Sequence, residues 1–508
     1  MNGKNKLAIK EIFSKPIAII VVATVLLLPL LLLGTRTSHD WGDDFAQYIH
    51  QAANIVNHIP QSETGFVYSQ LNYIGPQAYP IGFPLLLSPV YALAGNSMLA
   101  FTTYISLIYI VLGLLIVVFY RHYFTWFTSL VLAFVFVYNP QMIIFKREIM
   151  SDISFTALLV FNFILYQRVK SGNWKQITAL AFMIGLMLII RPAGIVFVAA
   201  VLMEQMVRLV KRKTDFRRFF YYSCILIFLP VFLYFTVNSV VFNIPSGGSI
   251  RDYLLFYYSG NFLQIIPGNF AHHIEVFRFL YIPQAGAFNG FSYLLGAAML
   301  TMALLGFVKR SIQSMEATEW FFVFYAIMLL VFPNNDSAFR LMVPLGFLCL
   351  FYAAIGLKTI QLFVDVEAWK KTMAAGIIIL LLFIPGLYRI AQFSGNTIEG
   401  PQQKSAIETF AFISKNIPAD SVVVFAKPRA LALYGGCKSM AEPFTTNPTL
   451  IHEQVIKAKA SYLLIHSKLT SVQMLRYSRV MQNRLSAIWR NKDFTLYKIN
   501  PVNPLAHR

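Results

Sequence analysis

The stretch IAIIVVATVLLLPLLLL, residues 17–33, is followed at once by GTRTSHDWGDD, residues 34–44. The first part is a long apolar run, and a membrane-spanning helix needs roughly 20 mainly apolar residues. The second part ends in two adjacent carboxylates, Asp43 and Asp44. An apolar segment with charged groups at its end predicts an integral membrane protein with polar chemistry at the membrane surface.

The composition of the whole chain supports this prediction. Of its 508 residues, 57% are hydrophobic and only 13% are charged, which is too little charge to cover the surface of a soluble protein. About eleven apolar segments have the length of a membrane span. They start near Pro16, Ser97, Thr125, Ile153, Gln176, Ala193, Phe219, Phe291, Glu319, Arg340 and Thr372. Leu33-Gly34-Thr35 is a poor cleavage site, so we expect the first segment to be retained.

The net charge of +20 is concentrated in alternate connections between the apolar segments. Basic residues precede the first segment and recur near Arg168, Arg208, Arg310 and Lys358. This bias places the N-terminus on the cytoplasmic side of a multi-pass inner (plasma) membrane protein, and an odd number of spans places the remainder outside. The same placement argues against a nucleic-acid partner, which would require a basic soluble module.

Two outer connections are long, at about 35–82 and about 243–290. The first contains an amphipathic stretch, Phe45–His58, which we expect to lie on the membrane surface. From about residue 393 the apolar runs shorten to strand length, as in Ser421–Phe425 and Tyr462–His466, and alternate with helix-like segments. The sequence therefore predicts an α-helical polytopic membrane domain over residues 1–392 and a small extracytoplasmic α/β domain over residues 393–508.

Trp41-Gly42-Asp43-Asp44 is the strongest chemical signal. Two adjacent carboxylates near a membrane repel each other, which raises the pKa of one of them and suits it to general-base work or to holding a metal. The alternative interpretation is that Asp43 or Asp44 caps the amphipathic helix that follows. The two interpretations are compatible, because one carboxylate can cap while the other faces a substrate.

A second signal is the short outer connection KREIMSD, which runs from Lys146 to Asp152. Lys146 and Arg147 break the charge bias, and a bound phosphate would compensate for them. The alternative is that they pair with Glu148 and Asp152 or with lipid head groups. Ser151 and Asp152 also open the next apolar segment, where a helix cap would account for them.

Two arginines and one aromatic element complete the candidates. Arg191 precedes Pro192 where an apolar run reaches the outer face, and Arg340 opens an apolar segment. Because charged residues near the membrane often have a functional role, both arginines are candidate site residues. The alternative for both is that the side chain extends to the membrane interface, where its charge is solvated. Tyr79-Pro80-Ile81-Gly82-Phe83-Pro84 predicts a bent, non-helical entry into the bilayer.

These motifs, taken in order, resemble the GT-C glycosyltransferases. The similarity is strongest to the bacterial branch that is related to protein O-mannosyltransferases and to the lipid A aminoarabinose transferase. The motifs are Gly42-Asp43-Asp44, Tyr79–Pro84, Met150-Ser151-Asp152, Arg191–Gly194 and Arg340–Pro344, followed by a C-terminal soluble domain. The resemblance implies a polyprenyl-phosphate-linked sugar donor and a site that faces outward. The tail lacks the sugar-binding trefoil repeats of protein O-mannosyltransferases.

The resemblance also implies roles for individual residues. The acidic residue of the first outer loop falls on Asp43 or Asp44, of which Asp44 is favoured, and that of the second falls on Asp152. Residues that bind the donor phosphate correspond to Arg340, Lys146 or Arg147. Glu148, Arg191 and Tyr79 are candidates for supporting roles. Whether a divalent cation (Mg, Mn or Zn) is held at Asp44 and Asp152 stays open.

The sequence therefore predicts a membrane glycosyltransferase that transfers a sugar to a lipid, glycan or protein acceptor, by an inverting single displacement. Two other classes are weighed against it. A lipid or solute transporter, or a flippase, would carry charges in the middle of its spans and two related halves. A non-catalytic membrane scaffold would use the outer domain to recruit a partner.

Overall fold

The fold is described from a computed structural model, which covers residues 16–69, 74–170, 172–245, 262–281, 289–332, 338–361 and 398–500. The described residues fall into two compact units. The helical unit lies within Met1–Thr35, Thr102–Thr236 and Asn261–Asn396, and the mixed unit lies within Arg36–Phe101, Val237–Gly260 and Thr397–Arg508. The first outer loop and the C-terminal segment thus pack together, although they are far apart in the sequence.

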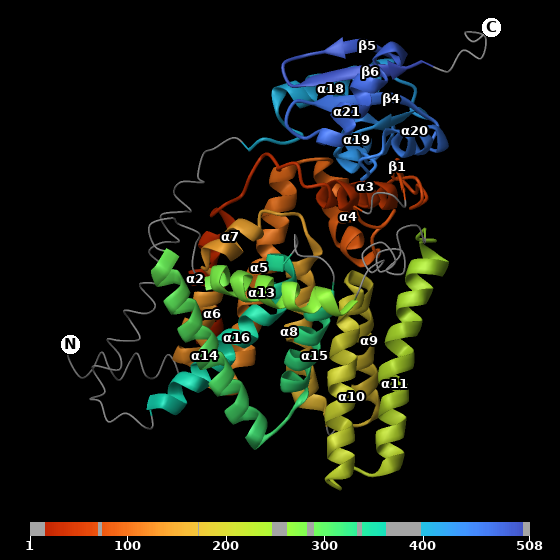
Figure 1. The fold of residues 1–508 in the computed structure, drawn as a ribbon. Helices are drawn as coiled ribbons and strands as arrows, with labels where there is room; N and C mark the ends of the chain where they lie inside the picture. Colours follow the sequence, from red (N-terminus) through yellow and green to blue (C-terminus); the bar gives the residue numbers. More distant parts are fainter. Residues whose placement is uncertain are drawn as a thin grey trace. The chain divides into compact units, whose positions relative to one another are not determined.

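The helical unit consists of apolar helices (Figure 1). They are α2 (Pro16–Leu27), η1 (Leu28–Leu31), α5 (Met98–Arg121), α6 (Trp126–Val137), α7 (Pro140–Phe145), α8 (Ser151–Val169), α9 (Trp174–Ile190), η2 (Pro192–Gly194), α10 (Ile195–Val210), α11 (Phe216–Phe235), α13 (Phe262–Tyr281), α14 (Asn289–Gln313), α15 (Ala317–Val331) and α16 (Ala338–Gln361). The short η3 (Thr236–Val241) starts at the last residue of this part of the unit and lies mainly in the mixed unit. Side-chain caps define several starts: Asn173 and Gln176 form a capping box at α9, and Asp215 caps α11.

Five helices of the described chain are long and apolar enough to cross a membrane: Met98–Arg121, Pro192–Val210, Phe216–Val241, Tyr293–Gln313 and Phe339–Ile360. They match the segments predicted to start near Ser97, Ala193, Phe219, Phe291 and Arg340. Shorter apolar helices lie at Ile17–Leu31, Gly82–Ala94, Trp126–Val137, Trp174–Ile190 and Ala317–Val331. The segment predicted near Thr372 lies outside the described residues, so the count of eleven stays a prediction.

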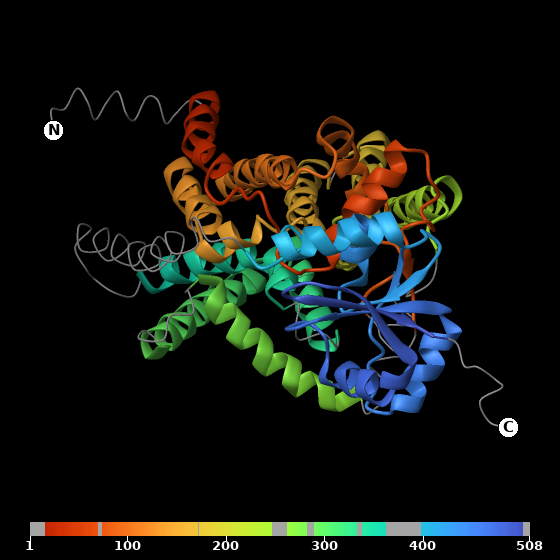
Figure 2. The ribbon, with the colours of Figure 1, turned by 90° about the horizontal axis from the view of Figure 1, so that it is seen from above.

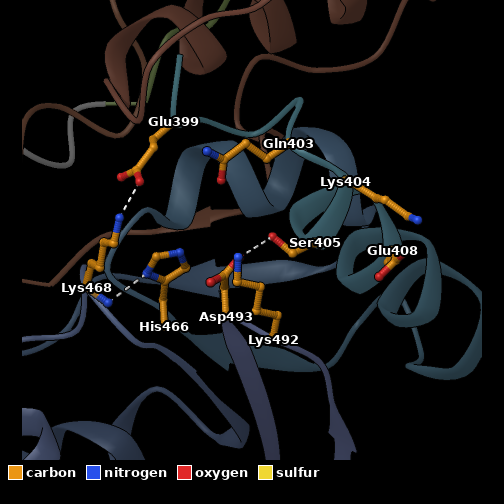
Figure 3. A pocket seen from close by; sticks show the side chains of 9 residues that line it. All are labelled: Glu399, Gln403, Lys404, Ser405, Glu408, His466, Lys468, Lys492 and Asp493. Carbon is orange, nitrogen blue, oxygen red and sulfur yellow. Dashed lines mark hydrogen bonds and ion pairs between the residues drawn. The ribbon is translucent and has the colours of Figure 1, made fainter. Parts of the chain in front are cut away.

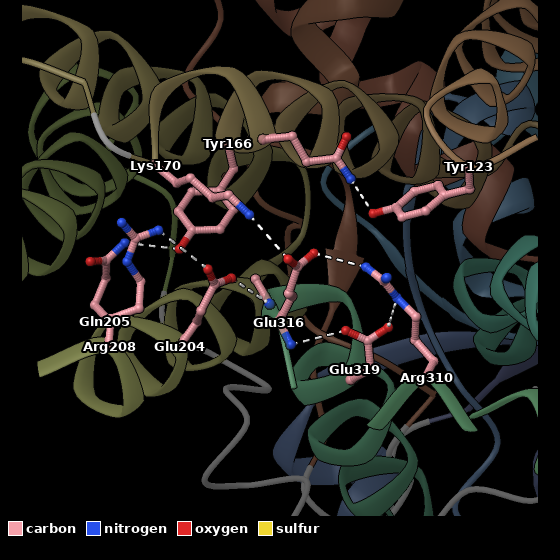
Figure 4. Close-up of polar contacts among 11 residues, drawn as sticks. Tyr123, Tyr166, Lys170, Glu204, Gln205, Arg208, Arg310, Glu316 and Glu319 are labelled. Atoms are coloured by element: carbon pink, nitrogen blue, oxygen red, sulfur yellow. Dashed lines mark hydrogen bonds and ion pairs between the residues drawn. The ribbon is translucent and has the colours of Figure 1, made fainter. Parts of the chain in front are cut away.

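A network of charged and polar side chains connects several helix ends in the helical unit (Figure 4). Arg310 Nη2 donates to Glu316 Oε2 at 2.9 Å, and Arg310 Nε lies 3.3 Å from Glu319 Oε1. Glu204 accepts a hydrogen bond from the Ala317 backbone N–H at 2.7 Å. The six charged groups balance: they are Lys170, Arg208, Arg310, Glu204, Glu316 and Glu319. Because each cation has an acidic partner here, the network explains how these basic residues are accommodated without a ligand.

The mixed unit combines a helix of the first outer loop, α3, and the helix that follows the loop, α4, with a six-stranded sheet. Its elements are α3 (Asp44–Val56), β1 (Phe66–Val67), α4 (Gly82–Ala94), α18 (Lys404–Asn416), β2 (Val422–Val424), α19 (Pro428–Gly435), β3 (Lys438–Met440), α20 (Pro448–Lys457), β4 (Ala460–His466), α21 (Val472–Val480), η5 (Gln482–Arg484), β5 (Leu485–Arg490) and β6 (Phe494–Ile499). The strand order is β1-β3-β2-β4-β6-β5. Strands β1 to β4 pair in parallel, and β6 pairs antiparallel with both β4 and β5.

Helices cover both faces of this sheet (Figure 2). Val423 and Phe425 point to the face covered by α18 and α19, whereas Val422 and Val424 point to the face covered by α20 and α21. The alternation along β2 is the strand period of two, with apolar side chains on both sides because both faces are buried. Strand β1 comes from the first outer loop and adds to β3, with Phe66 beside Ser439.

The predicted amphipathic helix is present as α3, but its apolar face is buried within the protein. Phe45, Ile49 and Ala52 have no exposed surface, and α3 packs against α4 and α19. The apolar face of α3 is therefore not available to lipid, and the placement of this helix on the membrane surface stays a prediction. The periodicity identifies an apolar face, and the face is covered by other elements of the mixed unit because α4 and α19 offer apolar surface of their own.

Candidate active site

The loop that precedes α3 is held in the mixed unit by Trp41. The indole is 7% exposed and makes ring contacts with Phe425 at 6.1 Å, with His466 at 5.7 Å and with Phe494 at 6.1 Å. The contacts with Phe425 and His466 are edge-to-face, an arrangement that adds stabilisation beyond the apolar area buried. The residue that stands two positions before Asp43 is thus a core residue of the sheet domain.

Asp43 lies at the N-cap position of α3 but makes no side-chain capping bond to that helix within the described chain. Its carboxylate instead accepts hydrogen bonds from the first turn of α19: from the Arg429 N–H at 3.4 Å and from the Ala430 N–H at 3.1 Å. Burial raises the pKa of Asp43 to about 6, although Arg429 and Lys427 act to lower it. The interpretation that Asp43 caps the amphipathic helix that follows it is therefore wrong, because its carboxylate binds the first turn of α19 instead.

Asp44 is the first residue of α3, and two side chains donate hydrogen bonds to its carboxylate. Arg429 Nη1 donates to Asp44 Oδ1 at 2.8 Å, and the Tyr79 hydroxyl donates to the same oxygen at 2.5 Å. The Arg429 side chain is fully buried, whereas the Asp44 side chain keeps 18% of its surface exposed. Asp44 is therefore a carboxylate of fixed orientation with access to solvent, which is what a positioned base requires.

Arg429 contacts both Asp44 and Tyr79, and it is not among the residues predicted from the sequence. Its Nη1 also donates to the Tyr79 hydroxyl at 3.1 Å, and its Nη2 donates to the Pro76 carbonyl at 2.7 Å. Gly75, at φ +129°, lies so close that an added Cβ would be 2.6 Å from Arg429 Nη2, so only glycine fits there. A sequence signal was available: Pro428-Arg429 follows the end of β2 at Val424 by a few residues, and residues that follow parallel strands often line a site.

Asp152 is a carboxylate of the helical unit that, like Asp44 in the mixed unit, is bound by arginine side chains. It lies in the first turn of α8, its side chain is fully buried, and it forms an ion pair with Arg191. Arg340 Nε lies 3.5 Å from its second oxygen, Oδ2. Met150 holds the N-cap position of α8 without a side-chain bond, so a cap does not account for Asp152. Pro192 explains the position of Arg191, because α9 ends before it and leaves Arg191 extended.

Among these three side chains alone, two guanidinium groups stand against one carboxylate. Arg191 and Arg340 are 16% and 17% exposed, so each is partly accessible. Guanidinium groups in this arrangement suit a phosphate, which accepts several charge-assisted hydrogen bonds. Of the residues predicted from the sequence, the helical unit thus brings Asp152, Arg191 and Arg340 together.

Lys146 and Arg147 lie in the turn after α7, next to the start of α16. Both side chains are buried, and Lys146 Nζ donates to Ser106 Oγ at 2.8 Å. The rings of Phe145 and Phe339 lie 5.4 Å apart, so this turn packs beside the first turn of α16, which carries Arg340. Glu148 follows in the same turn and is partly buried. These cations of the helical unit therefore lie on neighbouring segments.

Asp44 belongs to the mixed unit and Asp152 to the helical unit, and each has arginine partners within its own unit. A divalent cation at either carboxylate would have to share that carboxylate with its guanidinium partners. The donor sets as they stand favour charge compensation by arginine over metal binding.

The mixed unit also contains a polar pocket of about 580 Å³ at the end of α18 and the loops after β4 and before β6 (Figure 3). His466 lines it, and its Nδ1 accepts hydrogen bonds from the backbone N–H groups of Lys468 and Leu469. Asp493 accepts a hydrogen bond from Ser405 at 2.6 Å. The side chains around it are equally acidic and basic: Lys404, Lys468, Lys492, Glu399, Glu408 and Asp493.

No protein-family model matches this sequence, and no curated protein matches it by sequence. Solved structures do match the fold. The oligosaccharyltransferase of Archaeoglobus fulgidus in complex with Zn and sulfate has a TM-score of 0.61 and 12% identity, over 96% of this chain and 74% of that one. AglB from the same organism, in complex with an inhibitory peptide and a dolichol-phosphate, has a TM-score of 0.54 and 12% identity, over 89% and 69%.

ArnT from Cupriavidus metallidurans, bound to undecaprenyl phosphate, has a TM-score of 0.54 and 10% identity, over 94% of this chain and 97% of that one. AglB and ArnT are GT-C glycosyltransferases, so the resemblance seen in the sequence motifs is confirmed for the fold. Identities of 10–12% establish the fold alone.

Proposed function

We propose that this protein is a membrane glycosyltransferase that moves a sugar from a polyprenyl-phosphate carrier to an acceptor on the extracytoplasmic face. The observation that carries the proposal is the pair of carboxylate sites. Asp44 is fixed by Arg429 and Tyr79 in the mixed unit, and Asp152 is shared by Arg191 and Arg340 in the helical unit. The similar structures were solved with dolichol-phosphate or undecaprenyl phosphate, which supports the carrier class.

In this proposal Asp44 is the general base. It takes the proton from an acceptor hydroxyl or amine, whose oxygen or nitrogen then forms a bond to the anomeric carbon of the sugar. The bond from that carbon to the phosphate oxygen breaks, and the phosphate leaves with the electron pair. A single displacement inverts the anomeric configuration. Arg340, with Lys146 or Arg147, stabilises the negative charge on the leaving phosphate.

The proposal includes the side of the membrane on which each terminus lies and the number of spans. The charge bias supports a cytoplasmic N-terminus, about eleven spans, and an extracytoplasmic domain from about residue 393. The compact units suggest one refinement to the domain boundary. The first outer loop is part of the same compact unit as the C-terminal segment, so we propose that the two form one outer module.

The test is a transfer assay with purified protein in liposomes. A panel of undecaprenyl-phosphate sugars (hexoses, pentoses and amino sugars) is supplied with an envelope extract as the source of acceptors, and the release of undecaprenyl phosphate is measured. We expect Asp44→Asn to lower the rate by at least about 100-fold, the usual contribution of a general base. Asp43→Asn should retain more activity, because Asp43 faces α19. Full activity in both variants would overturn the assignment.

The same assay separates the other classes. A transporter or flippase would move the intact lipid-linked sugar across the liposome membrane without releasing undecaprenyl phosphate. A scaffold would leave every donor of the panel intact. Either result, obtained with protein that binds undecaprenyl phosphate, would contradict the proposed transfer reaction.

A further inference from the structure

The strand order of the mixed unit contains a reversal at β2. The chain passes from β2 through α19 to β3 on one side of β2, and then through α20 to β4 on its other side. In open α/β sheets, such a reversal creates a crevice outside the carboxyl ends of the two central parallel strands, where ligands of these folds usually bind. Here the crevice lies beyond Val424 and His466.

The first outer loop fills this crevice. Trp41 contacts the ring of Phe425, which follows β2, and the ring of His466, which ends β4. The carboxylate of Asp43 meets the first N–H groups of α19, the position at which a helix N-terminus binds an anionic ligand. A side chain of the same protein thus takes the place that a phosphate takes in other sheets of this kind.

A close backbone contact fixes the beginning of the loop. A Cβ at Gly400 would overlap the His39 carbonyl oxygen, so the two backbones touch at a point where only glycine fits. The His39 N–H donates to Gln402 Oε1 at 2.9 Å. The loop is therefore held at His39, Trp41 and Asp43 before it reaches Asp44.

Arg429 connects the crevice to Asp44. Its backbone N–H is one of the two groups that bind Asp43, and its buried guanidinium binds Asp44 Oδ1, the Tyr79 hydroxyl and the Pro76 carbonyl. A single residue of α19 thus contacts both carboxylates of the Asp43-Asp44 pair through different atoms.

We propose that the sheet domain of the mixed unit is a positioning module: its strand-reversal crevice binds the Trp41–Asp43 segment, and Arg429 orients Asp44 for the reaction. This inference rests on the proposed function, because Asp44 is the base assigned there. Asp43 is then an attachment residue, Asp44 is the catalytic residue, and Arg429 is a positioning residue that acts through Asp44 and Tyr79.

The first test does not depend on catalysis. Amide hydrogen exchange is measured on the full chain in detergent, for wild type, Arg429→Met and Asp43→Ala, with Arg490→Met on exposed β5 as the matched control. We expect Arg429→Met to speed exchange at least about tenfold in peptides that cover 41–48 and 75–82. Asp43→Ala should do so at Arg429 and Ala430. Unchanged exchange at 41–48 in Arg429→Met would overturn the proposed orientation of Asp44.

The second test is a double-mutant cycle in the liposome assay. If Arg429 acts only through Asp44, then Arg429→Met should lower the rate in the wild-type background and have little further effect in Asp44→Asn. Arg429→Lys, which can bind Asp44 through a single ammonium, should restore part of the rate. Additive losses in the cycle would mean that Arg429 contributes to general stability only. Absence of transfer in wild type would contradict the proposed function, while the exchange experiment would still decide on the positioning.

Discussion

The Tyr79 hydroxyl donates a 2.5 Å hydrogen bond to Asp44 Oδ1 while it accepts one from Arg429 Nη1 at 3.1 Å. Tyr79→Phe removes this hydroxyl and keeps the ring, which stacks on Tyr48 at 4.4 Å. We expect the rate of undecaprenyl phosphate release to fall about 3- to 10-fold, since one such bond contributes about 1 kcal/mol. Tyr91→Phe on α4 is the matched control. A rate equal to wild type would remove Tyr79 from the supporting residues.

Asp43 makes the stability of the protein depend on pH in a defined direction. Burial raises its pKa from 3.8 to about 6, so the folded protein keeps a proton that the unfolded chain has released. Stability is therefore lost as the pH rises from about 4 to about 6, and the loss of about 2 to 3 kcal/mol stays constant at higher pH. Asp43→Asn cannot ionise, so its melting temperature should rise relative to wild type across this range and level off above pH 7.

The measurement is thermal unfolding in detergent at pH 4.5, 6 and 7.5. Asp420→Asn is the control, because Asp420 is exposed and Lys438 lowers its pKa, which keeps it ionised over the whole range. A melting-temperature difference between Asp43→Asn and wild type that is the same at all three pH values would contradict the raised pKa of Asp43.

The sequence identified Asp43, Asp44, Asp152, Arg191 and Arg340 as candidates because charges beside apolar segments stand out against their surroundings. Arg429 could not be found in the same way, since a basic residue in the less apolar C-terminal segment has no such contrast. Its position follows from the parallel pairing of β2 with β4 and from the insertion of Trp41 between Phe425 and His466. The Trp41 contacts join residues hundreds of positions apart, and local periodicity carries no information about them or about the strand pairing.

The fold was also predictable only in part. The long apolar helices follow from composition and length. Strand β1, Phe66–Val67, is too short to show an alternation, so its pairing with β3 has no local signal. The amphipathic pattern of α3 is clear, but a pattern specifies an apolar face and leaves open whether lipid or protein covers it.

Arg340 and Asp152 should affect the binding of a lipid phosphate in opposite directions. Arg340→Gln removes one of the two guanidinium groups beside Asp152 and leaves Arg191 paired with it. We expect its affinity for undecaprenyl phosphate to fall about 10- to 100-fold, since a hydrogen bond to a charged group contributes about 1.5 to 3 kcal/mol. Asp152→Asn removes the negative charge between the arginines, so binding should be unchanged or tighter.

Binding is measured by titration of detergent-solubilised protein with undecaprenyl phosphate. The control is Arg217→Gln, which changes an exposed arginine on α11. Equal losses of affinity in Arg340→Gln and Asp152→Asn would indicate that the pair supports the structure and does not bind the phosphate.

Arg310 should matter for stability and not for the binding of a lipid phosphate. Its guanidinium contacts Glu316 and the fully buried Glu319 (Figure 4). Arg310→Met leaves a buried carboxylate without its cation, which we expect to lower the free energy of unfolding by about 3 kcal/mol. Unfolding in mixed micelles is compared with that of Arg217→Met, which changes an exposed arginine in the same way. Equal stability of the two variants would contradict a structural role for the network.

Lys146 should make the binding of a phosphate sensitive to pH near neutrality. It lies in the turn after α7, and burial, followed by repulsion from Arg147, lowers its pKa to about 7. A bound phosphate favours the ammonium form, so affinity should fall as the pH rises from 7 to 9 and the free amine accumulates, by up to about tenfold per pH unit. Lys146→Met should bind undecaprenyl phosphate more weakly at pH 6 and show no such fall.

The second ionisation of the phosphate, near pH 6, is complete in this range for both proteins. Ser106→Ala removes the hydroxyl that accepts the Lys146 hydrogen bond but keeps the ammonium, so it should retain the wild-type dependence on pH. Parallel pH curves for wild type and Lys146→Met would exclude Lys146 from the phosphate site.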